Sequence, residues 1–336
     1  MKILFSSYAF LPGVGGIETV SSILADEFVK AGHEVELITE TPGEDSELAG
    51  YGINRRPSRS KVISLLRWAD LFFQSNISLP SLLLALAFRK PCIVVHHTWI
   101  RDVGGELRWK DRLKRKFLSR VTNVAISRAV ADDLQRPCEI IANPYRDVTF
   151  RLIPGVTRNR DLVFLGRLVS DKGVDLLLRA VHQLRQMGSA PTLTIIGTGP
   201  EEEALRTLSA ELGLRDAVEF VGGKSGDELA TLLNQHRILV VPSRWAEPFG
   251  LVALEGTACG CAVVGSEDGG LKEAMGPCGI TFKNGDYPSL AAALDRLLGD
   301  RELEEALRGA GPTHLLPFKT SAVTRSYLQL IKEVVR

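Results

Sequence analysis

The chain has 336 residues, of which 45% are apolar and 24% are charged, and its formal net charge at pH 7 is +1. These values are typical of a globular protein long enough for two domains, and they exclude a fibrous or disordered chain. Because the net charge is close to zero, we expect no nucleic-acid partner. The opening apolar run, up to Ser6, is too short for a signal peptide, and the run from Leu82 to Phe88 is too short to cross a bilayer.

The five cysteines are scattered and form no Cys-x-x-Cys pair. This pattern is typical of reduced, buried thiols in a cytoplasmic protein. Cys259 and Cys261 are close enough to suggest a metal site, but no second pair and no nearby His completes four ligands. We interpret them as small residues at a tight junction between a helix and a strand.

The first part of the chain predicts a β-α-β unit. A strand at 3–6 is followed by a Gly-rich loop and by a helix with one apolar face, formed by Ile17, Val20, Leu24 and Phe28. Gly32 ends this helix, and a second strand is expected at 35–39. Further strands are predicted at 71–74, 93–97, 123–126 and 139–141, and helices near 80–88, 109–118 and 128–134. Strands that alternate with helices, without a hairpin signal, favour an α/β fold with a parallel, doubly wound sheet.

The segment 143–160 contains prolines and a glycine without periodicity, and we interpret it as a linker. The alternation then restarts, with strands expected at 162–165, 193–196, 219–221, 238–241, 262–265 and 280–282. We therefore predict two α/β domains, 1–155 and 156–316. The pattern does not decide whether the terminal helix, 317–336, stays with the second domain or crosses back to the first.

Two doubly wound domains that face each other place the carboxyl ends of both sheets at one interdomain cleft, where ligands bind in such folds. The loops that follow the strands are therefore the candidates for a functional site. These loops are 7–16, 96–105, 166–173, 197–200, 222–226 and 242–250.

The most informative segment runs from Glu247 to Glu255. Its first half is a Pro/Gly turn, and its second half predicts the first turns of a helix. Gly250 at the junction lets a ligand approach the backbone, and the free N–H groups of a first helical turn favour an anion. Carboxylates on either side of such an anion site suit a ligand that carries hydroxyls as well as phosphate, such as a sugar nucleotide.

A second informative segment follows the first strand of the second half. Arg167 at the strand end and Lys172 at the start of a helix can place two cations on one pair of phosphates. The alternative is two solvated cations at a turn. The flanking glycines, Gly166 and Gly173, and the position beside the predicted cleft favour the phosphate role.

In the first half, the loop with Gly15 and Gly16 opens a helix, but Glu18 takes the place of the third glycine of a dinucleotide fingerprint. The loop still predicts a close approach of a ligand to a helix N-terminus. His96 and His97 close a strand, and only one of them can point into the cleft because strand side chains alternate. That histidine either hydrogen-bonds a hydroxyl or is a buried structural imidazole.

Several motifs are missing from the sequence. It has no Gly-x-Ser-x-Gly elbow, no P-loop, no His-Glu-x-x-His and no Asp-x-Asp pair for a divalent metal. Phosphate binding by Arg, Lys and helix N-termini fits this absence. We therefore expect neither a metal nor another cofactor.

Taken together, these motifs resemble those of the family 4 glycosyltransferases, retaining enzymes of the two-domain GT-B fold. Glu247 and Glu255 match the E-x7-E motif of that family. The resemblance covers nearly the whole chain, and the other corresponding positions are 12–18, His97, 126–127, Asn143, 166–173, 197–200 and 240–243.

The resemblance implies a metal-independent hexosyltransferase that moves a hexose from a UDP- or GDP-sugar to a hydroxyl of a glycan, a glycolipid or a small molecule. It implies that Arg167 and Lys172 hold the diphosphate, that Glu255 binds the ribose and that Glu247 faces the transferred sugar. The backbone N–H groups of Phe249, Gly250 and Leu251 would contact the sugar and the phosphate.

For the first domain, the resemblance implies that Gly15 and Gly16 line the junction of donor and acceptor and that His97 contacts the sugar near the reacting carbon. The expected route is front-face substitution, in which the leaving phosphate helps to deprotonate the acceptor. Glu247 is then not a nucleophile.

The chain departs from the family pattern at Thr98, Pro144 and Ala262. It is also short, and we expect an outer strand and helix between 41 and 70 to be reduced. Two other functions share parts of the pattern, namely a catalytically inactive sugar-nucleotide-binding protein and a sugar-nucleotide 2-epimerase of the same fold.

Residues 101–120 include eight basic and three acidic side chains. The helix predicted at 107–120 has a basic face, formed by Arg108, Arg112, Arg115 and Lys116. Another face is apolar and is formed by Leu113, Phe117 and Val121. Contact with an anionic membrane surface and ordinary packing on the sheet both fit this pattern. We accordingly expect a cytoplasmic protein, either free or on the cytoplasmic face of the membrane.

Overall fold

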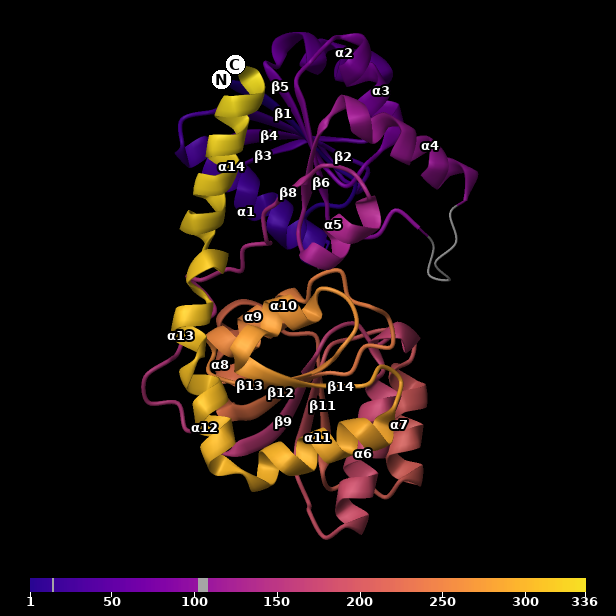
Figure 1. Cartoon of the computed structure of the whole chain (residues 1–336), viewed down its shortest axis with the longest axis vertical. Helices are drawn as coiled ribbons and strands as arrows, with labels where there is room; N and C mark the ends of the chain where they lie inside the picture. Colours follow the sequence, from indigo (N-terminus) through magenta and orange to yellow (C-terminus); the bar gives the residue numbers. More distant parts are fainter. Residues whose placement is uncertain (14, 102–107) are drawn as a thin grey trace. The chain divides into compact units, whose positions relative to one another are not determined.

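The computed structural model describes residues 1–13, 15–101 and 108–336, and it divides into two compact units (Figure 1). Unit 1 consists of Met1–Pro144 and Phe318–Arg336, and unit 2 consists of Tyr145–Pro317. The boundaries predicted from the sequence lie after residues 155 and 316. The start of the predicted basic helix, at residue 107, lies outside the described residues.

Unit 1 is built on an eight-stranded sheet of order β3-β4-β2-β1-β5-β6-β7-β8. Its strands are β1 (Lys2–Ser7), β2 (Glu34–Thr39), β3 (Ser46–Leu48), β4 (Tyr51–Arg55), β5 (Leu71–Ser75), β6 (Cys92–His96), β7 (Thr122–Ala125) and β8 (Glu139–Ile140). Its helices are α1 (Gly16–Lys30), α2 (Arg59–Trp68), α3 (Leu79–Ala87), α4 (Trp109–Phe117), η1 (Leu118–Arg120), α5 (Arg128–Leu134) and α14 (Thr320–Val335).

The central strands of this sheet are parallel and buried on both faces, as their continuous apolar runs predict. Phe5, Phe28 and Phe73 form an aromatic cluster, with ring centroids 4.8 Å apart for Phe5 and Phe73 and 5.3 Å apart for Phe28 and Phe73. The predicted parallel, doubly wound sheet is therefore confirmed for the centre of unit 1.

Between residues 41 and 70, where we expected a reduced outer strand and helix, the outer strand β3 has three residues and the helix α2 has ten. This segment contains β3, β4 and α2, and β3 pairs with β4 in antiparallel register, so the sheet also has a hairpin at its edge. The turn is made by Ala49 and Gly50, which both have positive φ values of 50° and 85°. Because β3 is short and exposed, it shows no apolar pattern that would reveal it in the sequence.

The terminal helix α14 belongs to unit 1, where it contacts α1 and β6 (Figure 1). Tyr327 on α14 is buried, and its ring lies 5.6 Å from that of Phe73. The 3-10 turn η4 (Leu316–Phe318) leads into this helix. The structure thus answers the question that the sequence left open, because the chain returns to unit 1 after it has completed unit 2.

Unit 2 is built on a six-stranded parallel sheet of order β11-β10-β9-β12-β13-β14. Its strands are β9 (Arg160–Leu165), β10 (Leu193–Ile196), β11 (Val218–Gly222), β12 (His236–Val241), β13 (Ala262–Ser266) and β14 (Gly279–Phe282). Its helices are η2 (Ser170–Lys172), α6 (Val174–Gln186), α7 (Glu202–Glu211), α8 (Gly226–Gln235), α9 (Leu251–Ala258), α10 (Leu271–Met275), η3 (Gly276–Cys278), α11 (Tyr287–Gly299), α12 (Arg301–Gly309) and α13 (Gly311–His314).

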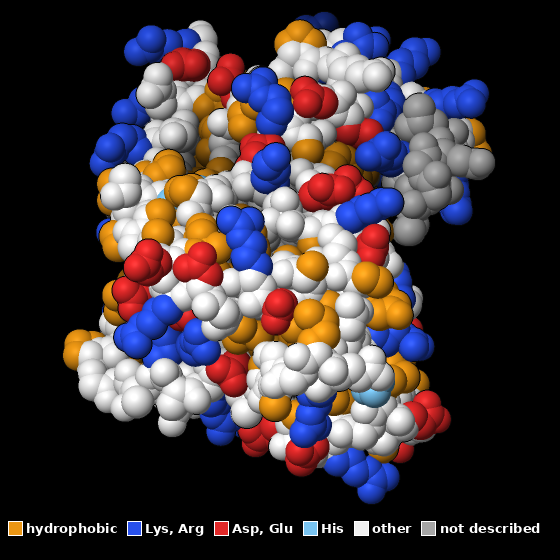
Figure 2. Space-filling model, turned by 60° about the horizontal axis from the view of Figure 1, so that its bottom comes forward, with side chains coloured by type: hydrophobic (Ala, Val, Ile, Leu, Met, Phe, Trp, Pro, Cys, Tyr) orange, Lys and Arg blue, Asp and Glu red, His pale blue; other side chains and the backbone are white. Residues whose placement is uncertain are grey.

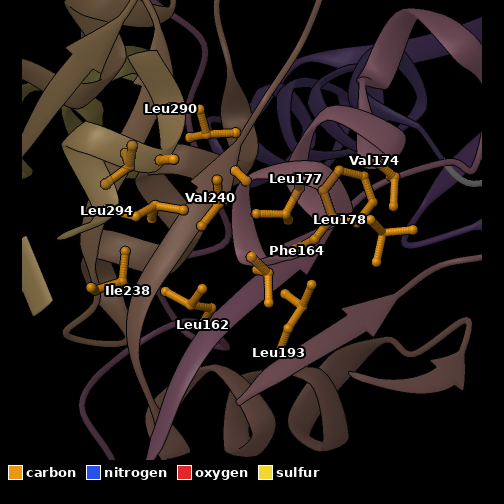
Figure 3. Packing of buried hydrophobic residues seen from close by; sticks show 14 of the residues in the cluster. Leu162, Phe164, Val174, Leu177, Leu178, Leu193, Ile238, Val240, Leu290 and Leu294 are labelled. Atoms are coloured by element: carbon orange, nitrogen blue, oxygen red, sulfur yellow. The ribbon is translucent and has the colours of Figure 1, made fainter. Parts of the chain in front are cut away.

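The core of unit 2 lies between this sheet and the helices α6 and α11. Figure 3 shows Leu177 of α6 and Leu290 of α11 on either side of Val240 from β12. These side chains are fully buried. Burial of a side chain of this size stabilises the fold by roughly 1.5–3 kcal/mol, so the core holds the strand ends, and the loops that follow them, in fixed positions.

The segment 143–160, interpreted from the sequence as a linker, forms no strand or helix before β9, and from Tyr145 onward it belongs to unit 2. Tyr145 and Phe150 are buried. The side-chain amide of Asn234 accepts from the N–H of Ile153 at 3.0 Å and donates to the carbonyl of Arg151 at 3.0 Å. The segment is therefore fixed by its own contacts.

The described residues include no helix long and apolar enough to span a bilayer. On the face drawn in Figure 2, Lys and Arg side chains are interspersed with Asp and Glu side chains. This distribution agrees with the near-zero net charge of the chain.

Replacing Tyr327 tests how far α14 stabilises unit 1. The Tyr327→Ala variant should lose about 3–5 kcal/mol of the free energy of unfolding, because it removes a buried ring that packs on Phe73. The Tyr327→Phe variant keeps the ring and should be at least as stable as the wild type, since the buried hydroxyl has no hydrogen-bond partner among the described residues. Urea denaturation measures both, and equal stability of the two variants would contradict the assignment.

Candidate active site

The sheet of unit 2 changes its winding direction between β9 and β12, which are neighbours in space. Ligands of doubly wound sheets bind outside the carboxyl ends of the strands at such a switch point. The loop after β9 carries Arg167 and Lys172, and the loop after β12 carries Glu247. The two predicted segments thus leave the sheet from neighbouring strands.

Two glycines after β10 let the chain lie against the loop that carries Arg167. The N–H of Gly166 donates to the carbonyl of Ile196 at 3.1 Å, and the N–H of Leu168 donates to the carbonyl of Thr198 at 2.9 Å. A Cβ at Gly197 would overlap the carbonyl oxygen of Gly166, and φ at Gly197 is +147°. These contacts fix the backbone on both sides of Arg167.

The side chain of Arg167 is exposed. Among the residues that the structure describes, its guanidinium has neither a hydrogen-bond nor an ion-pair partner. Arg167 therefore keeps its five N–H donors available for an anionic ligand.

Lys172 and Glu247 form an ion pair, with 2.5 Å between Lys172 Nζ and Glu247 Oε1. The hydroxyl of Ser243 donates to the same carboxylate oxygen at 2.6 Å. The pair is partly buried, so the charges compensate each other where hydration is incomplete. The sequence analysis assigned separate roles to these two residues and did not predict their contact.

The turn after Glu247 is fixed by a second close backbone contact. The carbonyl of Glu247 accepts from the N–H of Gly270 at 2.7 Å, and a Cβ at Gly269 would overlap that carbonyl oxygen. Gly250, with φ at +106°, precedes the first residue of α9, Leu251, and the side chain of Phe249 is buried. The N–H groups of Leu251 and Val252, in the first turn of α9, have no partner within the helix, whereas the N–H of Ala253 donates to the carbonyl of Gly250 at 3.0 Å.

Glu255 lies on α9 and is buried, with 9% of its surface exposed. Burial raises the pKa of its carboxyl to about 8, although the nearby Arg146 lowers it in part. Glu255 is therefore largely protonated at neutral pH. The spacing of the motif indicates a carboxylate at this position but not its burial.

In unit 1, Gly15 and Gly16 stand at the start of α1, which begins at Gly16. The side chain of Glu18 folds back over this turn, and a Cβ at Gly15 would stand 2.5 Å from Glu18 Oε2. Gly16 faces open space, since a Cβ there would meet nothing within 4 Å. The contact is with the end of the flexible Glu18 side chain, and φ at Gly15 is −178°, so the backbone itself does not demand glycine at position 15.

The structure distinguishes the two histidines at the end of β6, His96 as its last residue and His97 directly after it. His96 Nε2 lies 3.1 Å from Asn123 Oδ1, on the neighbouring strand β7, so His96 is bound within the sheet. His97 Nδ1 lies 3.1 Å from Asn143 Oδ1, whereas His97 Nε2 is buried and has no hydrogen-bond partner among the described residues. Burial lowers the pKa of both imidazoles to about 4, so both are neutral at pH 7.

The tautomer of His97 follows from its partner. The amide oxygen of Asn143 is an acceptor, so Nδ1 of the neutral imidazole carries the proton and donates it. The buried Nε2 then has a free lone pair, which a hydroxyl group can satisfy. Asn143 was identified in the sequence, but its role as the partner of His97 was not.

The structure thus brings together Lys172 with Glu247 and His97 with Asn143. Glu247 lies in the turn before α9, Gly250 caps this helix, and Glu255 lies within it. Sequence reasoning missed Ser243 as a partner of Glu247, although it lies in a stretch that had been singled out. Within the described part of the chain, no group of His, Cys, Asp and Glu side chains could hold a metal ion.

Two family models match the chain in succession. Residues 14–146 match "Glycosyltransferase Family 4", and residues 153–314 match "Glycosyl transferases group 1". These ranges fall almost entirely within unit 1 and unit 2, respectively.

Among its relatives, an uncharacterized glycosyltransferase of Methanocaldococcus jannaschii is 28% identical over 89% of this chain and 90% of its own length. A D-inositol 3-phosphate glycosyltransferase of Stackebrandtia nassauensis is 37% identical over 48% of this chain, and that match spans 38% of the relative's length. A glycogen synthase of Mycobacterium tuberculosis is 39% identical over 42% of this chain and 34% of the relative.

Solved structures share the fold of the whole chain. A sucrose-phosphate synthase of Thermosynechococcus elongatus superposes with a TM-score of 0.82 at 20% identity, covering 99% of this chain and 98% of that one. HepE of Anabaena, solved in complex with UDP and glucose, has a TM-score of 0.82 at 18% identity and covers 99% of both chains.

Two doubly wound units with these loops define a glycosyltransferase of the GT-B fold. Both family models and two of these relatives are named as glycosyltransferases, and together they place the enzyme in the hexosyltransferase class. The chain belongs to glycosyltransferase family 4. The family, the fold and the enzyme class inferred from the sequence are confirmed.

The raised pKa of Glu255 predicts a stability that depends on pH. Between pH 4.5 and about pH 8 the unfolded chain loses the proton of Glu255 and the folded protein keeps it, so the free energy of unfolding decreases as the pH rises. The Glu255→Gln variant lacks this contribution and should gain stability relative to the wild type between about pH 5 and pH 8. Urea denaturation at both pH values measures this, and a pH-independent difference would contradict the assignment.

Proposed function

We propose that the protein transfers a hexose from a nucleoside diphosphate sugar, such as a UDP- or GDP-sugar, to a hydroxyl of a glycan, a glycolipid or a small molecule, with retention of configuration and without a metal. The observation that carries the proposal is the Lys172–Glu247 pair beside the start of α9, at the switch point of unit 2. The structures of HepE with UDP and with UDP-glucose support a donor of this kind.

We assign the diphosphate to Arg167, Lys172 and the first N–H groups of α9. Arg167 can bind two phosphate oxygens at once because its guanidinium is free and its backbone is fixed. Lys172 supplies a point charge that the diphosphate shares with Glu247. The N–H groups of Phe249, Gly250 and Leu251 are assigned to the sugar and the phosphate.

We assign the hydroxyls of the donor to the two glutamates of the motif. Glu247 accepts from a hydroxyl of the transferred sugar, and Glu255 binds the hydroxyls of the ribose. In unit 1, the free Nε2 of His97 accepts from a sugar hydroxyl, and Gly15 and Gly16 line the junction of donor and acceptor.

Retention follows from substitution on one face of the sugar. The bond between the sugar carbon and the diphosphate oxygen breaks, the acceptor oxygen bonds to that carbon from the same side, and its proton moves to the departing phosphate. Arg167 and Lys172 stabilise the charge that develops on the phosphate. Glu247 is already bound by Lys172 and Ser243, which makes its carboxylate a poor nucleophile and fits a positioning role.

Donor binding is tested first by thermal shift against UDP-, GDP- and ADP-sugars, because a ligand of the folded state raises the melting temperature. The stabilising donor is then used in a transfer assay with the anomeric configuration of the product read by NMR. Retained configuration is expected, whereas inversion would defeat the proposed stereochemistry. Formation of an epimerised nucleotide sugar without any acceptor would instead identify an epimerase.

The Lys172→Met variant should lower kcat by about 10²–10³-fold, because it removes a cation from the developing charge of the leaving group. Lys30→Met is the matched control, since Lys30 also pairs with a glutamate, Glu27, at 2.7 Å but lies on α1 of unit 1. The control should keep the wild-type kcat. Wild-type turnover in the Lys172 variant would remove Lys172 from the proposed site.

We also propose that α4 contacts an anionic membrane surface, which would place the protein on the cytoplasmic face of a membrane. None of the residues of α4 is buried, and Trp109 and Leu113, four residues apart, are 69% and 36% exposed. Lys110, Arg112 and Lys116 are exposed around them. Exposed Trp and Leu side chains surrounded by cations suit the interface of an anionic bilayer.

The structure changes the cationic face that the sequence predicted. Arg115 turns toward the protein, where its Nη2 lies 3.0 Å from a carboxylate oxygen of Asp133 and its Nη1 donates to the carbonyl of Asp133 at 2.7 Å. Arg115 therefore attaches α4 to unit 1 and leaves the Trp109 side of the helix outward.

Co-sedimentation with vesicles of phosphatidylcholine and phosphatidylglycerol tests this contact. The wild type should pellet, salt should weaken the binding, and Trp109→Ala should reduce it. Tyr8→Ala is the matched control, because Tyr8 is an equally exposed aromatic residue, 70% exposed, outside α4. Absence of pelleting, or an equal loss in the Tyr8 variant, would overturn the proposal.

A further inference from the structure

We propose that Arg244 and Asp175 act as a positioning pair that holds the loop carrying Lys172 against the loop carrying Glu247. The inference rests on the proposed function of Lys172 and adds two residues that are 69 positions apart in the sequence. Arg244 follows β12, and Asp175 lies in the first turn of α6.

The contact between the two side chains is bidentate. Arg244 Nη1 lies 2.5 Å from Asp175 Oδ1, and Arg244 Nη2 lies 2.6 Å from Asp175 Oδ2. Two parallel charge-assisted hydrogen bonds fix orientation as well as distance, which a single ion pair does not. The loop after β12 is therefore held in one orientation relative to the start of α6.

Arg244 also binds the loop on the N-terminal side of Lys172. Its Nη1 donates to the carbonyl of Ser170 at 3.2 Å, and its backbone N–H donates to the carbonyl of Asp171 at 2.9 Å. Arg244 thus contacts Ser170 and Asp171, just before Lys172, and Asp175, just after it. Movement of Lys172 relative to Glu247 would have to break these contacts.

A close backbone contact completes the arrangement. Gly173 has φ at +66°, and a Cβ there would overlap the carbonyl oxygen of Pro242, two residues before Arg244. The two loops touch directly at this point, so the side-chain pair sits beside a main-chain contact that leaves little room for sliding.

The environment keeps both members of the pair charged. Burial raises the pKa of Asp175, but the hydrogen bonds from Arg244 outweigh this effect and the pKa is lowered overall. The hydrogen bond to Asp175 raises the pKa of Arg244. The negative charge of Asp175 in the first turn of α6 is further favoured by the helix dipole.

A double-mutant cycle in the transfer assay tests the pair. Arg244→Lys cannot make the bidentate contact, and Asp175→Asn loses the charge, so each variant should lower kcat by about tenfold or more while the KM for the donor changes less. The double variant should be no worse than either single one, because both changes remove the same interaction.

The cycle separates positioning from direct binding of the donor by Arg244. If Arg244 bound phosphate itself, Asp175→Asn would leave its cation in place, and donor affinity would be kept or improved. A wild-type kcat in Asp175→Asn, or additive losses in the double variant, would therefore overturn the proposal.

Arg185 and Asp216 supply the matched control. They form another bidentate pair in unit 2, with contacts of 2.8 and 2.6 Å, and neither residue lies in the loops of the site. Arg185→Lys and Asp216→Asn should keep the wild-type kcat. An equal loss of kcat in these variants would show that general destabilisation, not positioning, explains the effect.

Amide hydrogen exchange gives a readout that does not depend on the donor. The N–H of Lys172 donates to the carbonyl of Val169 at 3.0 Å, and the N–H of Gly173 donates to the carbonyl of Ser170 at 3.2 Å. Both should exchange faster in Arg244→Lys and Asp175→Asn and not in the control variants. Unchanged exchange in Arg244→Lys and Asp175→Asn would overturn the proposed positioning role. If exchange is faster in these variants but Lys172→Met is fully active, only the proposed function of Lys172 is contradicted.

Discussion

Direct contact between main-chain segments is the constraint on which the site of unit 2 depends. Gly173, Gly197 and Gly269 each lie where a Cβ would overlap a carbonyl oxygen of another loop. Because these loops touch without side chains between them, the backbone positions of Arg167, Lys172 and Glu247 depend on these main-chain contacts, beside which the Arg244–Asp175 pair lies. A substitution at one of these glycines would displace a charge without altering any charged residue.

The charged groups of the site in unit 2 are stabilised in three different ways. Arg167 is exposed and hydrated, Lys172 is compensated by Glu247 at 2.5 Å, and Glu255 is neutralised by a proton because burial raises its pKa to about 8. Holding uncompensated charges in partly buried positions would cost free energy in the absence of a ligand. The arrangement avoids that cost and still leaves one cation, one ion pair and one carboxyl group for polar ligand groups.

The sequence predicted those features that depend on local patterns. Continuous apolar runs revealed the central strands, and the glycine between Phe249 and Leu251 marked the start of α9. The edge strand β3 was missed because its residues are exposed. Contacts between residues far apart in the sequence could not be predicted either. Nothing in the spacing of Arg244 and Asp175, or of His97 and Asn143, indicates that the fold brings them into contact. The protonated state of Glu255 depends on burial, which only the packed structure shows.

The return of the chain to unit 1 has a consequence for synthesis. Unit 2, Tyr145–Pro317, is inserted between the two parts of unit 1, so a ribosome makes α14 only after all of unit 2. Until then the nascent unit 1 lacks Tyr327, and the side of Phe73 and α1 that α14 covers stays open to solvent. Domains generally fold in the order in which they emerge. Here the second unit can complete its core first, and the first unit closes only after α14 has been made.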